Sequence, residues 1–400
     1  MLSIGRPRLA LRSPVAMVLN CGSSSVKYQL FENDASILRG SVENIGSSNC
    51  KHSTTIGGVS SVDISPYDYP TAITAAIKRA LDVRSEIACV GHRVVHGGPY
   101  LTQPTLINAE TLSQIQACSQ LAPLHNPSNL RGIELAQEAL TGVPQVACFD
   151  TAFHCKIPPK AHRYAIPRAL ADKEKLRRYG FHGLSYAYVS GIVRERRMIV
   201  AHLGSGCSVA AIVDGKSIDT TMGFTPMEGL VMSTRAGSID PGLMIHLLNQ
   251  PEFSSPASLS NLLNKKSGLL GLSGQSADMK QLLDIEKRGG DGASHAHEAV
   301  EVFVYTVQKY IGQLMASLEY NVDAIVFTGG IGENSPEVRE RILRSFSNYG
   351  VVVDREANHS PGPRGIISAN NSRMRLFAIK TNEELQIARD SLGLITSLNV

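Results

Sequence analysis

Four ionisable residues of this chain lie in local contexts that surface charges rarely occupy. Arg93 lies inside the apolar segment 89–95, where an unpaired guanidinium would be costly, so it needs either a structural carboxylate or an anionic substrate. Arg235 lies in the segment 232–242, which is rich in turn-forming residues and favours contact with a ligand. Two arginines in such surroundings indicate that small anions are bound.

The other two residues are an acid and a histidine. Asp150 directly follows the apolar segment 145–149, at the end of a strand where ligands bind in α/β sheets. His182 lies between Gly180 and Gly183, which would let a phosphate approach closely. Guanidinium and imidazole groups of this kind stabilise the transferred group in phosphoryl transfer, so the four residues favour that chemistry.

Two segments, 17–31 and 198–213, repeat one plan in the two halves of the chain. Each passes from an apolar strand through a Gly/Ser turn into a second apolar strand. Glycine lets the backbone bend sharply, and Ser hydroxyls and turn N–H groups offer donors to phosphate oxygens. One such turn is weak support, but two matched copies predict a duplicated domain that binds a polyphosphate between its halves.

Other phosphate and metal motifs are missing from the sequence. There is no G-x-x-x-x-G-K-[ST] pattern, so the chain is not a P-loop protein. His92 and His96 have a helical spacing, but Gly97 and Gly98 argue against the helix that would direct both at one metal. A structural or substrate-side role is therefore favoured for this pair.

The hydrophobic pattern predicts alternating strands and helices in both halves. The segment 39–70 is expected to hold further strands joined by loops, and Ser128 or Asn126 to cap the third helix. The last helix is expected to cross back onto the first hairpin. Helices are predicted over 71–82, 109–121, 128–140, 243–263, 293–319 and 382–394, and strands over 87–95, 145–150 and 324–328, with a Gly-rich turn after the last of these strands and another helix from about Pro336.

Composition narrows the class of protein. The 400 residues are 43% hydrophobic and 18% charged, with a net charge of +4 that is too mild to indicate a nucleic-acid partner. Seven scattered cysteines without a CxxC pair predict reduced thiols in a cytoplasmic protein, and no apolar run is long enough for a membrane span. Residues 1–16 are expected to be a disordered native leader, with an organellar transit peptide as the alternative.

Seven sequence blocks, taken together, resemble the acetate kinase family. They are 20–27 (NCGSSSVK), 91–98 (GHRVVHGG), 121–126 (LAPLHN), 149–154 (FDTAFH), 177–183 (RRYGFHG), 327–334 (FTGGIGEN) and 381–384 (TNEE). This family belongs to the superfamily of actin-like ATPases and sugar kinases. The resemblance therefore implies an α/β fold of two duplicated actin-like (ribonuclease H-like) domains around a central ATP cleft. The expected domains are residues 1–151 with 384–400 and, as the nucleotide-binding and dimerising domain, residues 152–383.

The resemblance also implies roles for individual residues. Arg93 and Arg235 would hold the carboxylate and the migrating phosphoryl group, Asp150 would be the catalytic acidic residue, and His182 would stabilise the transition state beside His125. The first hairpin would bind phosphate through Ser23, Ser25 and Lys27, and the metal through Asn20 together with Glu383. The nucleotide would be bound by His202, Leu203, Gly204, Ser205, Gly206, Asp278, Met279, Lys280, Gly329, Gly330, Ile331, Gly332 and Glu333. The methyl group of the substrate would enter a small apolar pocket of Val95, Leu124, Phe181 and Pro226.

The implied reaction is the reversible, in-line transfer of the γ-phosphoryl group of ATP to acetate, with Mg²⁺ as cofactor and Mn²⁺ as its substitute. A small carboxylic acid has a pKa of about 4.3 and is already an anion at neutral pH, so its attack needs no general base. Asp150 is therefore expected to orient an arginine or assist the metal, with proton abstraction as the alternative. ATP or ADP and acetate or acetyl phosphate are the expected partners, and a homodimer is the expected assembly.

Two residues depart from the family pattern, and two other functions compete. Ser205 stands where the family usually has Asn, and Lys280, where it normally has Arg, loses a planar face that could stack on adenine.

Propionate or butyrate kinase activity is the alternative within the enzyme class, since a methylene is worth only about 1–3 kcal/mol, although Val95 favours acetate. Outside the enzyme class, the alternative is an actin-like protein that binds a nucleotide without catalysis.

Overall fold

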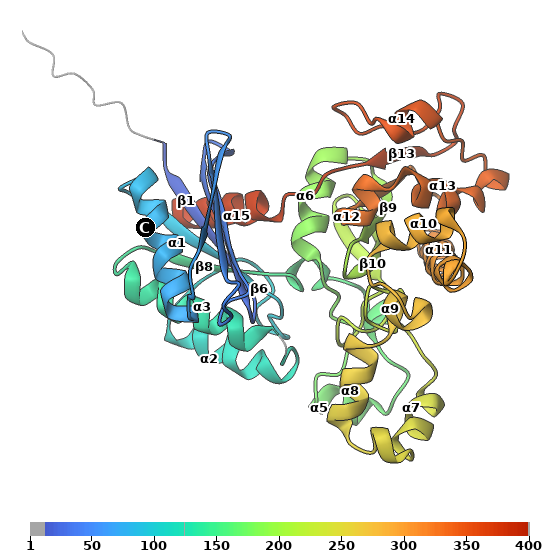
Figure 1. Ribbon diagram of the computed structural model, residues 1–400, viewed down its shortest axis with the longest axis horizontal. Helices are drawn as coiled ribbons and strands as arrows, with labels where there is room; N and C mark the ends of the chain where they lie inside the picture. Colours follow the sequence, from blue (N-terminus) through green and yellow to red (C-terminus); the bar gives the residue numbers. More distant parts are fainter. Residues whose placement is uncertain (1–12, 124, 399–400) are drawn as a thin grey trace, which may run out of the picture. The chain divides into compact units, whose positions relative to one another are not determined.

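The computed structural model describes residues 13–123 and 125–398 and divides into two compact units (Figure 1). Unit 1 runs to Val95, resumes over Gln103–Phe149 and ends with the segment from Glu384. Unit 2 takes His96–Thr102 and Asp150–Glu383. Each unit has its own sheet with helices packed against it.

The sheet of unit 1 has the strand order β5-β4-β3-β2-β1-β6-β8-β7. Strands β1 to β5 form an antiparallel meander, whereas β6 is parallel to both β1 and β8. The strands are β1 (Val15–Cys21), β2 (Ser25–Glu32), β3 (Ala35–Glu43), β4 (Lys51–Ile56), β5 (Val59–Ile64), β6 (Cys89–Val94), β7 (Thr105–Leu106) and β8 (Gln145–Phe149).

The sheet of unit 2 repeats the centre of the first sheet. Its order is β11-β10-β9-β12-β13, with β9, β10 and β11 antiparallel and β12 parallel to β9 and β13. This matches β3-β2-β1-β6-β8 strand for strand, in both order and direction. The predicted duplication is therefore confirmed at the level of topology. The strands are β9 (Arg197–Leu203), β10 (Cys207–Val213), β11 (Lys216–Thr220), β12 (Ala324–Thr328) and β13 (Arg375–Ala378).

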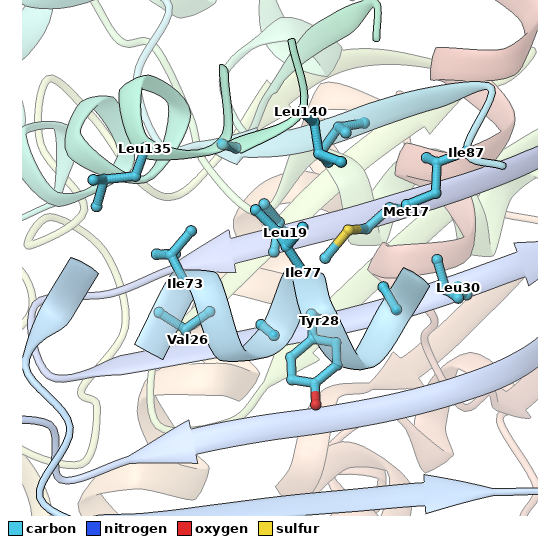
Figure 2. Packing of buried hydrophobic residues seen from close by; sticks show 14 of the residues in the cluster. Met17, Leu19, Val26, Tyr28, Leu30, Ile73, Ile77, Ile87, Leu135 and Leu140 are labelled. Carbon is cyan, nitrogen blue, oxygen red and sulfur yellow. The ribbon is translucent and has the colours of Figure 1, made fainter. Parts of the chain in front are cut away.

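The helices of unit 1 bury an apolar stripe against β1, β2 and β6. Ile73 and Ile77, one turn apart on α1, pack in a cluster with Met17 and Leu19 of β1 and with Leu135 of α3 (Figure 2). Burial of each isoleucine contributes about 1.5–3 kcal/mol. The helical segments are α1 (Tyr69–Val83), α2 (Ala109–Ala117), η1 (Cys118–Gln120), α3 (Asn126–Ala139) and α15 (Glu383–Leu398).

In unit 2, the apolar faces of α6 and α11 are buried. Alternate residues of β9, such as Met198 and Val200, pack with Tyr186 and Val189 of α6. The helical segments are η2 (Ala152–His154), α4 (Pro159–His162), α5 (Arg168–Lys173), α6 (Gly183–Val193), α7 (Pro241–Leu248), η3 (Pro251–Phe253), α8 (Pro256–Lys265), α9 (Gly268–Ser273), α10 (Met279–Arg288), α11 (Ala293–Ser317), α12 (Gly329–Asn334), α13 (Pro336–Arg344), η4 (Ser347–Tyr349) and α14 (Arg355–His359).

The last helix, α15, returns to the first unit. A Cβ added to Gly91 of β6 would lie 2.5 Å from both Ile387 Cγ2 and Ser391 Oγ, so the strand and the helix are in direct contact. Figure 1 shows this red helix among the blue and cyan elements of unit 1. The last helix therefore returns to unit 1, but it packs on β6, the strand next to β1, and the prediction that placed it on the first hairpin was imprecise.

Two predictions about helices were wrong in detail. The segment 243–263 is not one helix, because Pro251 and Pro256 cannot donate backbone hydrogen bonds and separate α7, η3 and α8. Helix α3 begins at Asn126 itself, with His125 as the preceding residue and no side-chain cap. Neither Asn126 nor Ser128 therefore caps it. Over the described ranges, none of the helices has the length and apolar character needed to cross a bilayer.

Candidate functional site

The turn of the second hairpin lies at the centre of the candidate site in unit 2. It joins β9 to β10 across the paired residues Leu203 and Cys207, and the amide of Gly204 donates to the carbonyl of Gly206 at 3.1 Å. The amide of Ser233 donates to the carbonyl of Ser205 at 3.2 Å, so a distant loop fixes the turn. Ser205 itself is exposed, as a phosphate-binding hydroxyl must be.

His182 approaches this turn from a strained backbone position. Its φ of 59° is left-handed, and the next amide, of Gly183, donates to the carbonyl of Asp150 at 2.8 Å. The imidazole Nδ1 hydrogen-bonds with the hydroxyl of Ser208 at 2.9 Å. A Cβ added to Gly206 would lie 3.2 Å from Nε2 of His182, so this ring nitrogen faces the turn. Glycine at 206 thus leaves room beside the imidazole.

Arg235 reaches the same place from the loop after β11. The Cβ added to Gly206 would lie 3.6 Å from its Nη1, which donates to the carbonyl of Pro226 at 3.1 Å. Burial lowers the pKa of Arg235 below its usual value. In residues 13–123 and 125–398, no carboxylate forms an ion pair with this guanidinium. A partly buried cation that has no carboxylate partner in those residues and lies beside a phosphate-type turn is suited to an anionic ligand.

A cavity of about 660 Å³ opens beside the turn. Helix α10 supplies one wall along its length, and α12 with the start of α13 supplies the other. The sequence-predicted residues Gly204, Ser205, Asp278, Met279, Lys280, Gly330 and Ile331 all line it, together with residues that the sequence did not single out, including Lys287, Asn334, Glu337 and His359. A cavity of this size can hold a nucleotide.

Several residues that were predicted to bind the nucleotide hold neighbouring parts of the backbone in place. The carboxylate of Glu333 accepts from the amides of Gly329 and Thr381, each at 3.0 Å, so it fixes the glycine segment. Gly329 has a φ of +77°, and a Cβ there would come within 2.8 Å of the carbonyl oxygen of Leu203. Asp278 caps α10 by accepting from the amide of Gln281 at 2.9 Å.

The glycine segment is helical, where the sequence suggested an open turn. It forms α12, and Gly332 is buried against Phe327 of β12. His202 is the penultimate residue of β9 and hydrogen-bonds through Nδ1 with the hydroxyl of Ser185 at 2.9 Å. The second hairpin, His182, Arg235 and the glycine segment thus converge within unit 2.

Glu228 is a supporting residue that the sequence analysis missed. Its carboxylate accepts from Arg178 at 2.6 Å and from the hydroxyl of Tyr164, which itself accepts from the amide of Phe224 at 2.8 Å. This cluster holds the loop that carries Pro226, the acceptor for Arg235. Glu228 could have been noticed as a lone acid between Gly223 and Gly229 in an otherwise uncharged loop.

Unit 1 carries the other predicted residues on and beside its first hairpin. Asn20 is the penultimate residue of β1, opposite Lys27 of β2, and the amide of Gly22 closes the turn on the carbonyl of Ser25 at 2.8 Å. Ser23 and Lys27 are exposed. The turn resembles that of the second hairpin but is one residue longer between its paired strand ends.

Two residues of unit 1 that the sequence analysis did not single out hold this hairpin in place. The side chain of Asn129 donates to the carbonyl of Cys21 at 2.7 Å and accepts from the amide of Val95 at 3.1 Å. The hydroxyl of Tyr69 donates to the carbonyl of Gly22 at 3.0 Å. The predicted pocket residue Val95 is thereby tied to the first hairpin. A polar side chain among the apolar positions of a helix is the signal that could have identified Asn129.

The remaining predicted residues lie at the ends of elements. Arg93 is partly buried in β6, and His125 directly precedes α3, whereas Leu124 lies outside the described residues. Asp150 is 2% exposed and is the first residue of unit 2 after β8. Glu383 is the last residue of unit 2 before α15 continues into unit 1. Asp150 and Glu383 thus lie where the chain passes between units.

Buried aromatic rings fix the predicted pocket residue Phe181. The ring of His96 lies edge-on to it, with ring centroids 5.5 Å apart, and the carbonyl of Phe181 hydrogen-bonds with Nε2 of His154 at 2.9 Å. Burial lowers the pKa of His96 and of His154 to about 4, so both are neutral at pH 7. Pro226 is half-buried. The two histidines therefore act as packing and hydrogen-bonding groups.

The chemistry of the predicted metal ligands suits a hard divalent cation. Asn20 offers an amide oxygen and Glu383 a carboxylate, and Mg²⁺ prefers one or two such ligands with phosphate oxygens and water. Among residues 13–123 and 125–398, no three His, Cys, Asp or Glu residues are grouped closely enough to bind a metal by themselves. A site that depends on the phosphates of a ligand is consistent with both observations.

The chain is similar along its whole length to curated acetate kinases. It is 43% identical over 398 residues to the acetate kinase of Natranaerobius thermophilus and 44% identical over 400 residues to that of Halothermothrix orenii, covering 95% of this chain and 99% of each relative. A propionate kinase structure from Francisella tularensis matches with a TM-score of 0.88 and 41% identity, over 95% of this chain and 99% of that one. The Porphyromonas gingivalis acetate kinase structure matches with a TM-score of 0.84 and 38% identity, over 96% and 100%.

The duplicated sheets, the phosphate-type turn and these similarities define the class: a phosphotransferase with a carboxyl group as acceptor, built from two actin-like domains, which uses ATP and a divalent metal. The model of the acetokinase family matches residues 15–389. The chain belongs to the acetokinase family.

Proposed function

We propose that the protein is an acetate kinase, which transfers the γ-phosphoryl group of ATP to acetate and forms acetyl phosphate and ADP. The observation that carries the proposal is Arg235, a partly buried guanidinium that lies near His182 at the turn of the second hairpin. The adjoining cavity is large enough for the nucleotide. Because an acyl phosphate is itself a strong phosphoryl donor, the reaction runs in both directions.

The main barrier to this reaction is electrostatic. Acetate is an anion at neutral pH, with a pKa of about 4.3, so it attacks without a base but must approach a polyanion. Arg235 and Arg93 offset that repulsion, and His182 donates to an oxygen of the migrating group. In related phosphoryl transfers, one such cation is worth about 10³–10⁵ in rate.

Asp150 has an orienting role in this mechanism. Its backbone carbonyl accepts from the amide after His182, so the same residue fixes the strained conformation of the histidine. Its carboxylate then orients an arginine or a water molecule of the metal. Transfer is direct and in line, without a phosphoenzyme.

Mg²⁺ is the metal that we propose, with Mn²⁺ as its substitute. Asn20 and Glu383 would hold it, and Lys27, Ser23 and Ser25 would line the phosphates. When bound, the metal neutralises charge on the phosphate oxygens. In this proposal, the first hairpin and Val95 would contact the phosphates and the acyl group, whereas unit 2 would bind the nucleotide.

We also infer a cytoplasmic homodimer. The cysteines of the described part are free thiols and most are buried, which suits a reducing compartment. The homodimer is an expectation from the family, to be checked by light scattering of the purified protein.

Propionate is the second candidate acceptor, because a propionate kinase is among the similar structures. One methylene in an apolar pocket is worth about 1–3 kcal/mol, so the two acids overlap as substrates. Val95, which is 9% exposed, restricts the pocket and favours acetate.

A hydroxamate assay of the purified protein with ATP, Mg²⁺ and acids of increasing length tests the proposal. We expect the highest kcat/KM with acetate, a lower value with propionate and almost none with butyrate. A preference for propionate would replace the proposed substrate, and no acyl phosphate with any acid would reject the proposed activity.

A further inference from the structure

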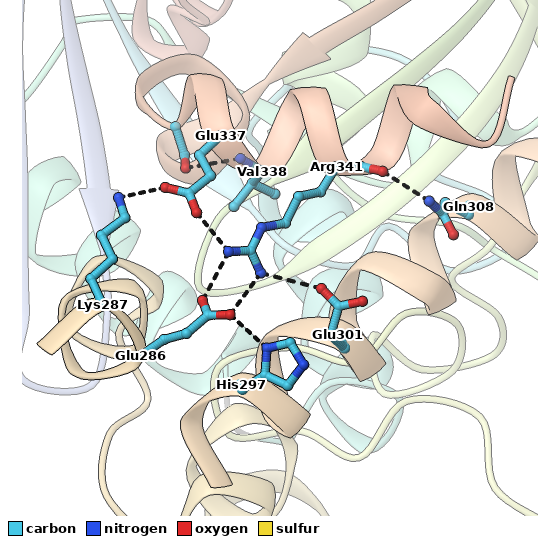
Figure 3. Close-up of polar contacts among 9 residues, drawn as sticks. Glu286, Lys287, His297, Glu301, Gln308, Glu337, Val338 and Arg341 are labelled. Atoms are coloured by element: carbon cyan, nitrogen blue, oxygen red, sulfur yellow. Dashed lines mark hydrogen bonds and ion pairs between the residues drawn. The ribbon is translucent and has the colours of Figure 1, made fainter. Parts of the chain in front are cut away.

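One arginine at the far end of the nucleotide cavity joins three helices. Arg341 of α13 bonds Glu337 one turn earlier, at 2.6 Å, and Glu286 of α10, at 2.9 Å (Figure 3). Its other guanidinium nitrogen also contacts Glu301 of α11 at 3.2 Å. The second carboxylate oxygen of Glu337 accepts from Lys287 of α10 at 2.5 Å. The guanidinium thus fixes the carboxylates of Glu337 and Glu286, and the carboxylate of Glu337 in turn binds Lys287.

This network is more than a set of exposed surface pairs. The side chains of Arg341 and Glu286 are 20% and 15% exposed. Burial alone would raise the pKa of Glu337, but hydrogen bonds from Lys287 and Arg341 outweigh it and hold the pKa below its usual value. The pKa of Lys287 is raised by the same hydrogen bond. Both groups are therefore charged at neutral pH, and networks hold their geometry better than isolated pairs.

Only part of the network borders the cavity. Lys287 and Glu337 line it from opposite walls, Lys287 from α10 and Glu337 from α13, whereas Glu301 does not line it. Lys287 lies roughly 10 Å along α10 from Lys280, given the rise of a helix. On the other wall, Gly330 is the residue close to the hairpin, its amide being 3.7 Å from a Cβ added to Gly204.

We propose that the Lys287–Glu337 pair, held by Arg341, is a clamp that fixes the separation of the two cavity walls and so sets the affinity for the nucleotide. The two residues are positioning residues, because they act on the ligand through the walls that they join. The inference rests on the proposed function only in that the cavity binds a nucleotide, whatever the phosphoryl acceptor.

The proposed clamp explains why Arg341 orients Glu337, an arrangement that folding stability alone does not require. An exposed lysine paired with a glutamate contributes little to folding, yet here the glutamate is pre-oriented by a largely buried arginine. Preorganisation of a binding site lowers the ordering that the ligand must impose. Loss of the pair should therefore weaken nucleotide binding more than it weakens the fold.

The test measures ADP dissociation constants by calorimetry for Glu337→Gln, Lys287→Met and the double variant, alongside KM for ATP and for acetate. We expect each single variant to weaken ADP binding by about threefold to tenfold, the usual size of such couplings. KM for ATP should rise with it, while kcat and KM for acetate stay close to their original values. The double variant should be no worse than the more affected single variant, because both disrupt one interaction.

Glu301→Gln is the matched control. It removes the same charge and another contact of Arg341, but at a position outside the cavity. Equal weakening of ADP binding in this control would overturn the clamp, as would fully additive effects in the double variant, which would mean that each residue contacts the ligand independently. Because ADP binding needs no acceptor, a protein that binds ADP but forms no acetyl phosphate would reject the proposed function and leave this inference standing.

Discussion

The imidazole rings of His182 and His202 are stacked, with their centroids 4.2 Å apart and their planes 20° from parallel. One ring belongs to the residue before α6, and the other belongs to the end of β9 next to the second hairpin. Each ring also has its own hydroxyl partner through Nδ1, Ser208 for His182 and Ser185 for His202. The stack thus couples the position of His182 to the hairpin that it faces.

Gly206→Ala should impair the chemistry without preventing nucleotide binding. The new Cβ would lie 3.2 Å from His182 Nε2 and 3.6 Å from Arg235 Nη1, the space that the migrating group would occupy. We expect kcat to fall by about tenfold to a hundredfold, as small misplacements in active sites do. Steady-state kinetics measures the fall in kcat, and calorimetry measures the binding of ADP. Gly312→Ala on α11, where nothing lies within 4 Å of the new Cβ, should keep kcat unchanged.

Arg235→Ala should abolish acyl phosphate formation while the protein still binds ADP. The guanidinium is partly buried and donates only to Pro226 and, weakly, to the sulfur of Met232 within the described ranges, so removing it breaks no ion pair there. A fall of about 10³ or more in kcat is expected. Arg355→Ala, in which a surface guanidinium is lost, is the control. Near-normal turnover by the Arg235 variant would refute the assigned role.

Asp150→Asn should remove most of the activity and leave the fold intact. The backbone carbonyl that fixes His182 is unchanged in this variant, so only the carboxylate is tested. The hydroxamate assay and the thermal midpoint are the two measurements. Unfolding of the variant at assay temperature would instead assign the carboxylate a structural role.

Glu228→Gln should impair the acyl end of the site selectively. The change weakens the contacts with Arg178 and Tyr164 that hold the loop of Pro226. We expect kcat/KM for acetate to fall by about tenfold and ADP affinity to stay the same. Asp172→Asn, which removes the exposed partner of Arg163, is the matched control. A parallel loss of ADP affinity would show that the cluster supports the whole unit and has no selective effect on this loop.

Stability should fall as the pH is lowered below about 6.5. Burial lowers the pKa of His92, His96 and His154 to about 4 from a usual 6.5, so the unfolded chain takes up protons that the folded chain refuses. Their contribution is complete above pH 6.5 and is lost as the pH falls through 4, at most about 3 kcal/mol for each histidine. Denaturant unfolding at several pH values measures this.

A histidine substitution separates this source of pH dependence from others. His154→Asn should give a shallower fall in unfolding free energy between pH 6.5 and 4, because an amide does not titrate there. His359→Gln, at an exposed position, should keep the original slope. Identical slopes for all three proteins would rule out His154 as a contributor.

The sequence was most informative where local chemistry and topology coincide. The two Gly/Ser turns identified both hairpins, because strand–turn–strand segments form by neighbouring pairing. The polar context of Arg235 and the glycines beside His182 indicated residues that do converge in unit 2. Arg235 lies in the long loop between β11 and α7, and His182 directly precedes α6, so their convergence itself is set by tertiary packing.

Residues that act through distant partners could not be predicted in the same way. Glu228 is recognised only through Tyr164 and Arg178, which are far away in the sequence. Glu337 is recognised only through Lys287 of another helix, together with Arg341 one turn later on its own helix. Helix boundaries also failed where proline altered a periodic apolar pattern, as it did between α7 and α8. Pairings of this kind are set by tertiary packing and leave no periodic trace.

The contact between Gly91 and α15 has a consequence for how the chain is made. The first unit contains both the earliest and the latest described parts of the chain, so its strands emerge from the ribosome long before the helix that covers them. The face of β6 around Gly91 stays open to water, chaperones and proteases until that helix has been made. Closure of the unit therefore waits for α15, and removing this helix would leave the earlier-made strands without their cover.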